Sequence, residues 1–347
     1  MSPSPRERFV AALRGEAQDA PTGWMMRQAG RFLPEYRAMR EGRTFVEAVE
    51  DPEFAAEVTL QPIRRFGMDV AVIFCDILMP PKELGLDLSF EAGHGPKLVP
   101  TIRDKADLAH LKDFDPRVAC AYLSTAIAKV RSALDGMDGG ERGIMGFCGA
   151  PFTTASYMVE GASSRNFENT KRLMLTDPET FSTLQARLVD HLIPYLAMQV
   201  EAGADALQIF DSWGGHLDAA SYRRHLLPHL KRLVAGAKET GAPVVIYLNG
   251  GSHLLEVLAD AEPDCIGLDF RIDIADARRR LPSLALQGNL DPTTLFTTPE
   301  IVEAEMNRTL DAFGGHPGHV FNVGSGLLPK TSIACVERAF ETLRARR

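Results

Sequence analysis

Seven short apolar runs recur along the chain, and their alternation with helical patterns limits the fold more than any other feature of the sequence. Within each run the apolar residues are continuous rather than alternating, which is typical of parallel strands covered on both faces. The intervening segments carry apolar residues at helical spacing, for example over 184–202, 222–238 and 299–313. The predicted strands cover residues 69–75, 143–147, 206–210, 244–248, 265–268, 284–287 and 319–323.

This repetition of strand and helix predicts βαβ units and a parallel sheet. We predict an eighth strand either at 96–99 or in the region 24–26. Seven or eight units in 347 residues predict a single (β/α)8 TIM barrel of about 250 residues with insertions. No GxGxxG follows the first strand, so a dinucleotide-binding sheet lacks direct support. No segment is long or polar enough to be a linker, and we therefore expect one domain over residues 1–347.

Polar residues follow almost every predicted strand. The active site of a barrel lies at the carboxyl ends of its strands, so these positions are candidates for chemistry. A single polar residue after a strand is equally well explained as a turn former, but the repetition at successive strands favours a shared site. The candidates are Asp76, Asp211, Ser212, Asn249, Asp269, Asn289, Asp291, Asn322 and Ser325.

The densest basic segment covers residues 27–43 and holds five arginines, two glutamates and no lysine. Arginine presents a planar fork that binds carboxylates through two hydrogen bonds. A solvated helix face would have the same composition, but Gly30 and Pro34 interrupt a continuous helix and place the first two arginines in a loop. Pro34 suits the first turn of a short helix that ends near Gly42. In a chain of net charge −8, we predict that this arginine-rich loop binds an anion.

Charge and cysteine content argue against several classes of function. A net charge of −8 disfavours nucleic-acid or anionic-membrane partners, and no stretch has the pattern of a signal peptide or a membrane-spanning helix. Five scattered cysteines without a CxxC pair argue against a disulfide framework or structural zinc and favour a reducing cytoplasm. His225 and His229 have metal-like spacing but lack the zinc-protease pattern, so we predict no metal site.

Six blocks of the sequence resemble the uroporphyrinogen decarboxylase family, in matching order from about residue 5 to the C-terminus. The resemblance implies a (β/α)8 barrel, usually a homodimer, which agrees with the strand count. It also implies a cofactor-free carboxy-lyase of porphyrin and haem biosynthesis that removes the four acetate carboxyls of uroporphyrinogen III to give coproporphyrinogen III. The blocks are WMMRQAGRFLPEYR (24–37), the segment 51–78 that contains FCDIL, GFCGAPFTTASYMVEG (146–161), IFDSWGG (209–215), LQGNLDP (286–292) and FNVGSGLLP (321–329).

The resemblance also implies roles for single residues. Asp76, in FCDIL, corresponds to the carboxylate that accepts hydrogen bonds from the pyrrole N–H groups and stabilises the ring cation of the reaction. The proton donor proposed for the family would be Arg27. A guanidinium holds its proton too firmly for an efficient acid, so a clamp on the substrate is the safer role. The implied substrate contacts are the arginine loop Arg27, Gln28, Ala29, Gly30 and Arg31, together with Tyr157 and Ser212.

Two positions depart from the family pattern. The family usually has a substrate-contacting histidine where this chain has Ser325, which donates a hydrogen bond but carries no charge. It has tryptophan where this chain has Phe270. The first departure leaves open a divergent relative that binds tetrapyrroles without turnover. The other alternative is a zinc- and cobalamin-type methyltransferase of the same fold, but that group needs His-x-Cys at 248–250 and a cysteine in the last glycine turn.

Overall fold

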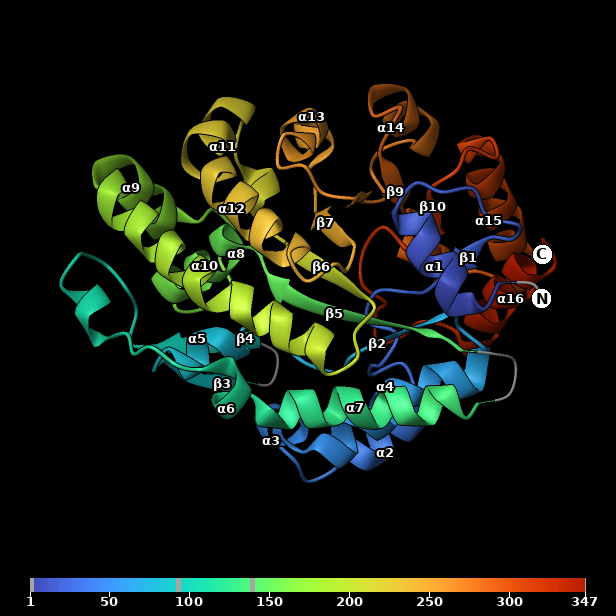
Figure 1. Ribbon diagram of the computed structural model, residues 1–347, viewed down its shortest axis with the longest axis horizontal. Helices are drawn as coiled ribbons and strands as arrows, with labels where there is room; N and C mark the ends of the chain where they lie inside the picture. The colour runs from blue at the N-terminus through green and yellow to red at the C-terminus, as the bar shows by residue number, and fades with distance from the viewer. Residues whose placement is uncertain (1–2, 92–94, 138–140, 347) are drawn as a thin grey trace.

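The structure, a computed structural model, describes residues 3–91, 95–137 and 141–346, and its centre is one sheet of eight parallel strands (Figure 1). Each of the seven predicted runs overlaps one of these strands, so the predicted (β/α)8 barrel is confirmed. The strands are β1 (Thr22–Gly23), β2 (Val70–Val72), β5 (Gly143–Gly149), β6 (Ala206–Asp211), β7 (Val244–Leu248), β8 (Cys265–Gly267), β9 (Ala285–Gln287) and β10 (His319–Phe321). Their order around the barrel is β1-β10-β9-β8-β7-β6-β5-β2.

The short strand β1 is the eighth strand, and it closes the barrel between β10 and β2. It pairs in parallel with β10. On its other side, the Asp69 N–H donates to the Gly23 carbonyl oxygen at 3.3 Å, and the Asp69 carboxylate accepts from the Gly23 N–H at 3.0 Å. A strand of two residues is too short to give an apolar pattern, which is why the sequence indicated only the adjacent region 24–26.

The other predicted position for the eighth strand, 96–99, is wrong. β4 (Gly95–Val99) pairs antiparallel with β3 (Asp87–Glu91) in a separate two-stranded sheet. Figure 1 shows this pair beside α5 (Met79–Glu83), outside the barrel. A hairpin strand and a barrel strand of this length have the same local pattern, and only their pairing partners distinguish them.

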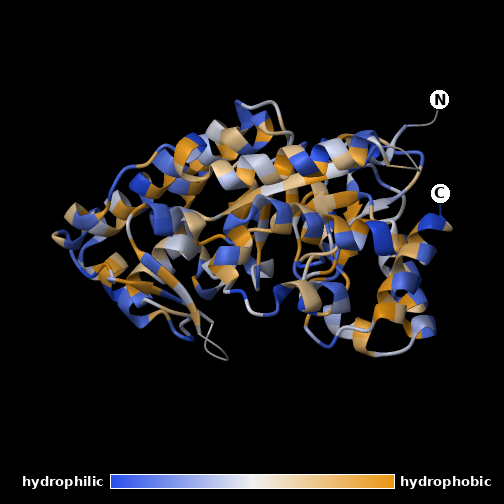
Figure 2. Ribbon diagram, turned by 90° about the horizontal axis from the view of Figure 1, so that it is seen from below, coloured by the Kyte–Doolittle hydropathy of each residue, from blue (hydrophilic) through white to orange (hydrophobic). Residues whose placement is uncertain are grey.

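Helices surround the barrel, and Figure 2 shows hydrophobic residues on the central strands with mixed faces on the helices around them. The predicted helices at 184–202 and 299–313 are present, but the one at 222–238 breaks at Leu226, because Pro228 starts a new helix there. None of the described helices is long and apolar enough to cross a membrane. Together with α5, the α-helices of the described chain are α1 (Pro5–Leu13), α2 (Pro34–Arg40), α3 (Phe45–Glu50), α4 (Pro52–Phe66), α6 (Pro116–Ala119), α7 (Ala121–Asp135), α8 (Pro151–Glu160), α9 (Glu168–Thr176), α10 (Pro178–Glu201), α11 (Ala219–His225), α12 (Leu227–Lys238), α13 (Leu255–Ala259), α14 (Ile274–Arg280), α15 (Pro299–Phe313) and α16 (Ile333–Arg344).

The amino end and the interior of the barrel are filled. Phe9 of α1 is fully buried, and a Cβ on Gly143 at the start of β5 would lie 2.7 Å from its ring. Inside, Trp24 Nε1 donates to Gln287 Oε1 at 3.0 Å, and Gln287 Nε2 donates to Gln208 Oε1 at 2.8 Å. These packed and hydrogen-bonded layers leave the carboxyl ends of the strands as the place for a site.

Candidate active site

Asp76 follows β2 at the carboxyl end of the barrel and is partly exposed. Its Oδ1 accepts a hydrogen bond from the Leu78 N–H at 2.9 Å, which fixes the side chain at the entrance to α5. Desolvation raises the pKa of Asp76 to about 6, while the Leu78 N–H and the positive charge of Arg27 act in the opposite direction. The site therefore holds a carboxylate that is ionised at neutral pH and poorly solvated, and such a group favours a nearby cation.

The arginine loop is held at this end of the barrel by hydrogen bonds to the backbone of Met26, the residue before Arg27. The Met26 N–H donates to Asn322 Oδ1 at 2.9 Å, and the Leu327 N–H donates to the Met26 carbonyl oxygen at 2.8 Å. Arg27 itself has φ +63°, an uncommon conformation for a residue with a side chain, and the surrounding bonds maintain it. The loop is thus a fixed element that presents the Arg27 side chain.

Arg27 and Arg31 are exposed, and within the described residues neither has a carboxylate partner within 4.0 Å. In the same segment, Arg43 is paired with Asp51 at 2.6 Å. The predicted short helix after the loop is present as α2. The two loop arginines consequently keep their charge and their planar forks available for an anionic ligand.

Gln28 is fully buried, and its side chain binds the protein itself. Its Oε1 accepts from the Met25 N–H at 3.0 Å, and its Nε2 donates to the Val70 carbonyl oxygen of β2 at 2.8 Å. A Cβ on Gly30 would lie 2.8 Å from the Arg27 carbonyl oxygen, so the turn through Ala29 and Gly30 is tight. Gln28 ties the arginine loop to β2, the strand that precedes Asp76. Residues 28–30 therefore have mainly backbone groups to offer to a ligand.

Tyr157 on α8 is half-buried close to Asp76 and Arg27. Burial raises its pKa to about 12; the Asp76 charge acts in the same direction, and Arg27 acts in the opposite one. The phenol ring lies on Trp213, with centroids 3.9 Å apart, and Trp213 in turn contacts Phe167. The structure therefore gathers Asp76, Arg27 and Tyr157 at one place, from three elements that are distant in the sequence.

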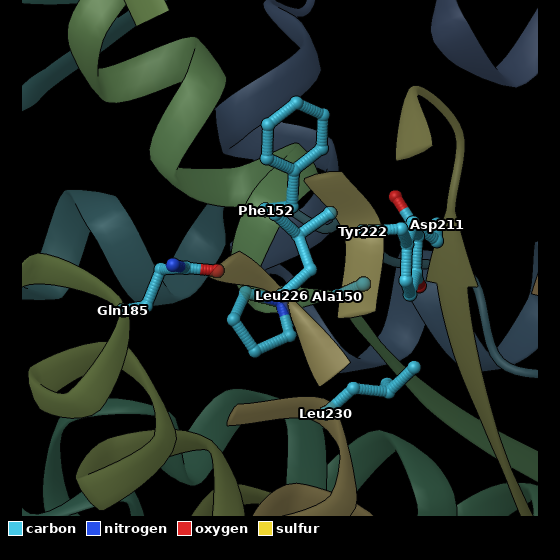
Figure 3. Close-up of a pocket in the computed structure, with 8 residues that line it drawn as sticks. Ala150, Phe152, Gln185, Asp211, Tyr222, Leu226 and Leu230 are labelled. Atoms are coloured by element: carbon cyan, nitrogen blue, oxygen red, sulfur yellow. The ribbon is translucent and has the colours of Figure 1, made fainter. Parts of the chain in front are cut away.

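Asp211 at the end of β6 holds the loop that presents Ser212. It is buried and accepts hydrogen bonds from Thr153 Oγ1 at 2.6 Å, the Gly214 N–H at 2.9 Å and the Tyr222 hydroxyl at 2.9 Å. Figure 3 shows Asp211 and Tyr222 side by side at a narrow gap beside α8, α11 and α12. Burial raises the pKa of Asp211, and these three donors counter the effect. Ser212 follows and is partly exposed.

Ser325 lies in the glycine turn after β10, against Tyr247 of β7. The Tyr247 hydroxyl donates to the Gly324 carbonyl oxygen at 3.0 Å, and Ser325 is the next residue of the turn. Burial raises the pKa of Tyr247 well above its usual range. Tyr247 was not among the residues predicted from the sequence, where its one distinguishing feature is that it is the aromatic residue of an otherwise aliphatic run, VVIYL.

Most of the other polar residues after the strands hold loops together. Asn289 Nδ2 donates to the carbonyl oxygens of Asp269 and Ile272, and Asn322 Oδ1 accepts from two backbone N–H groups. Asp291 accepts from the Thr293 N–H at the start of a 3-10 helix. For these three residues the hydrogen bonds favour the turn-former alternative that the sequence left open, because turns at strand ends need side-chain partners for their backbone groups.

Comparison with known proteins identifies the family. A family model described as uroporphyrinogen decarboxylase (URO-D) matches residues 4–346. The chain belongs to this family. The resemblance seen in the sequence blocks is thereby confirmed, together with the prediction of a carboxy-lyase and of decarboxylation in porphyrin biosynthesis.

Named uroporphyrinogen decarboxylases are similar to the chain over nearly its whole length. The protein of Saccharophagus degradans is 43% identical, covering 93% of this chain and 92% of its own. That of Roseiflexus sp. is 44% identical, covering 96% and 97%, and that of Streptomyces coelicolor is 44% identical, covering 96% and 92%.

Solved structures share the fold at low identity. A methyltransferase from Methanosarcina mazei has a TM-score of 0.79 at 19% identity and covers 99% of this chain and 98% of its own. A B12-independent methionine synthase from Shewanella sp. W3-18-1 has a TM-score of 0.57 at 11% identity, covering 95% and 98%. These likenesses concern the fold alone. Among the described residues, no group of three or more histidines, cysteines and carboxylates is arranged to hold a metal ion.

Proposed function

We propose that this protein removes the four acetate carboxyls of uroporphyrinogen III and releases coproporphyrinogen III, without a cofactor. The observation that carries the proposal is a poorly solvated carboxylate, Asp76, within reach of the Arg27 charge, on a loop whose exposed Arg27 and Arg31 have no carboxylate partner among the described residues. A substrate with eight carboxylates around its rim can pair with such arginines. Its pyrrole N–H groups can donate hydrogen bonds to the Asp76 carboxylate.

The chemistry needs an electron sink, and the substrate's own ring supplies it. Protonation of a pyrrole carbon makes that ring a cation. The bond between the acetate methylene and its carboxyl then breaks, CO2 leaves, and the bonding electrons neutralise the ring. The methylene group takes up one proton to become a methyl group, and the ring loses the proton it had gained. Asp76 accepts hydrogen bonds from the pyrrole N–H groups and stabilises the cation, which is preorganised electrostatic catalysis.

The remaining site residues bind and orient the substrate in this proposal. Arg27 and Arg31 clamp carboxylates, and the backbone of Gln28, Ala29 and Gly30 completes the loop. We assign Arg27 to the clamp rather than to proton donation, since a guanidinium is a poor acid. Further hydrogen bonds to substrate carboxylates come from the hydroxyls of Tyr157, Ser212 and Ser325.

The pH dependence of turnover follows from the ionisation of Asp76. Its carboxylate form is the active one, and its pKa is raised to about 6, so kcat/KM for uroporphyrinogen is expected to fall tenfold per pH unit below about pH 6. Rates measured anaerobically from pH 5 to 8 check this. A profile that stays flat down to pH 5 would show that ionisation of Asp76 does not govern the rate.

An anaerobic assay with uroporphyrinogen III tests the function. Products are oxidised and separated by their number of carboxyl groups, and we expect the seven-, six- and five-carboxyl intermediates to give way to the four-carboxyl product. Binding of the substrate without any loss of carboxyls would favour the alternative of a tetrapyrrole-binding relative. The absence of both binding and turnover would overturn the proposal.

Assembly and location are also proposals. We infer one barrel domain over residues 1–347 that forms a homodimer, as the family usually does, without nucleic-acid or membrane partners. The net charge of −8 supports the last point. All five cysteines are unpaired, and four of them are buried, which supports a cytoplasmic location.

A further inference from the structure

Arg271 lies at the carboxyl end of the barrel, two residues after Asp269, and its side chain is held at one nitrogen. One guanidinium nitrogen, Nη1, donates to Asn249 Oδ1 at 3.1 Å and to Asp269 Oδ2 at 3.2 Å. The guanidinium also lies over the Phe270 ring, 4.5 Å from its centroid. These contacts fix the direction of a long side chain that would otherwise be mobile, and they reduce the entropy that a ligand contact would cost.

The rest of the Arg271 guanidinium is available. Its side chain is 51% exposed, whereas that of Asp269 is 1% exposed. The Asp269 carboxylate also accepts from the N–H groups of Gly250 and Arg271, so its oxygens are already satisfied by the protein. Within the described residues, the other guanidinium nitrogens of Arg271 have no partner. The exposed Arg271 guanidinium is thus anchored by the buried Asp269 carboxylate. This arrangement presents the edge of the guanidinium that has no partner outward.

The glycines on either side of Ser325 approach the Asp269–Phe270 backbone and the Arg27 side chain, respectively. A Cβ on Gly324 would overlap the Phe270 backbone, and a Cβ on Gly326 would lie 2.5 Å from Arg27 Cδ. Tyr247 donates a hydrogen bond to the Gly324 carbonyl oxygen in this turn, and the charges of Arg271 and Arg27 both lower its pKa. Arg27 and Arg271 therefore flank the same glycine turn from two sides.

We propose that Arg271 binds a second carboxylate of the substrate, on the far side of Ser325 from Arg27. The inference rests on the proposed function, since a macrocycle with carboxylates around its whole rim needs cations on more than one side of the site. Ser325 and Tyr247 contribute only neutral hydroxyls there. Arg271 supplies positive charge at this side of the turn, and a carboxylate bound to its free edge is held bidentately.

The test compares Arg271→Met and Arg271→Lys with Arg279→Met in the anaerobic assay. Arg279 is a matched control on α14, since its side chain is 71% exposed and pairs with Asp276. We expect Arg271→Met to raise KM for uroporphyrinogen about tenfold with a smaller change in kcat, because a charge-assisted hydrogen bond to the bound substrate is lost. Arg271→Lys should recover part of the loss, since it keeps the charge but not the fork.

The outcomes distinguish substrate binding by Arg271 from a purely structural role in the loops. They also distinguish failure of this proposal from failure of the proposed function. If Arg271 only ties the loops together, Arg271→Met lowers the melting temperature and Arg271→Lys gives no specific rise in KM. If the Met variant does not fold, a raised KM in a stable Lys variant still supports the proposal. Unchanged KM in both variants, relative to Arg279→Met, would overturn it. Wild-type protein that fails to turn over uroporphyrinogen would instead overturn the proposed function.

Discussion

Replacing Asp76 by asparagine is expected to lower kcat for uroporphyrinogen decarboxylation by about 10²–10³-fold, the usual loss when one preorganised stabilising group is removed. Asparagine has almost the same size as aspartate and can still accept the Leu78 N–H, so the loop geometry is kept. What disappears is the negative charge opposite the pyrrole cation. Single-turnover rates on the wild type and the variant measure the effect directly.

Stability distinguishes this loss from misfolding. The pKa of Asp76 is raised to about 6, so its ionisation destabilises the folded state as pH rises from about 4 to 6, and the penalty is complete above that window. Asp76→Asn removes the penalty, and its melting temperature at pH 7.5 should equal or exceed that of the wild type. Asp218→Asn, at an exposed helix cap that asparagine also satisfies, is the matched control. Activity of Asp76→Asn within twofold of this control would remove Asp76 from the mechanism.

Arg27→Met is expected to raise KM by about 10–150-fold, the range for a charge-assisted hydrogen bond of roughly 1.5–3 kcal/mol. It should also move the acid limb of the pH profile upward, because the Arg27 charge lowers the pKa of Asp76. Arg27→Lys keeps that charge and loses the planar fork, so its KM should rise while the acid limb stays in place. Steady-state kinetics over the pH range give both quantities.

The backbone cost at position 27 is the same in all of these variants, because φ is positive there for any residue with a side chain. Arg308→Met on α15 is a control for the loss of one exposed positive charge, since Arg308 is paired with Glu305 on the same helix. A KM for Arg27→Met within twofold of this control would show that Arg27 does not bind the substrate.

The barrel could be predicted from the sequence because parallel strands buried on both faces leave continuous apolar runs, such as 244–248. β1 could not be predicted, since its two residues are defined by pairing with β10 and by the Asp69 hydrogen bonds. The break at Leu226 lies within an unbroken apolar pattern, and only Pro228 hinted at it. Pairing and local helix ends depend on tertiary contacts that a single-sequence pattern does not contain.

The residues of the candidate site could be predicted from the sequence to different degrees. Asp76 and the arginine loop stood out by charge and position, and their proximity required the fold. The polar residues after the strands have different roles. Asp211 and Asn289 form hydrogen bonds with backbone groups of the loops, and the sequence does not distinguish this role from a chemical one. Arg271 was missed because a single arginine after a strand is unremarkable until its contacts with Asn249 and Asp269 are seen.

The most direct test is turnover by protein treated with a strong chelator and then desalted. We expect the treated protein to convert uroporphyrinogen III anaerobically to coproporphyrinogen III at the untreated rate, with four CO2 released per macrocycle, because the ring itself takes the electrons. Loss of activity on chelation that added zinc restores would contradict the cofactor-free mechanism.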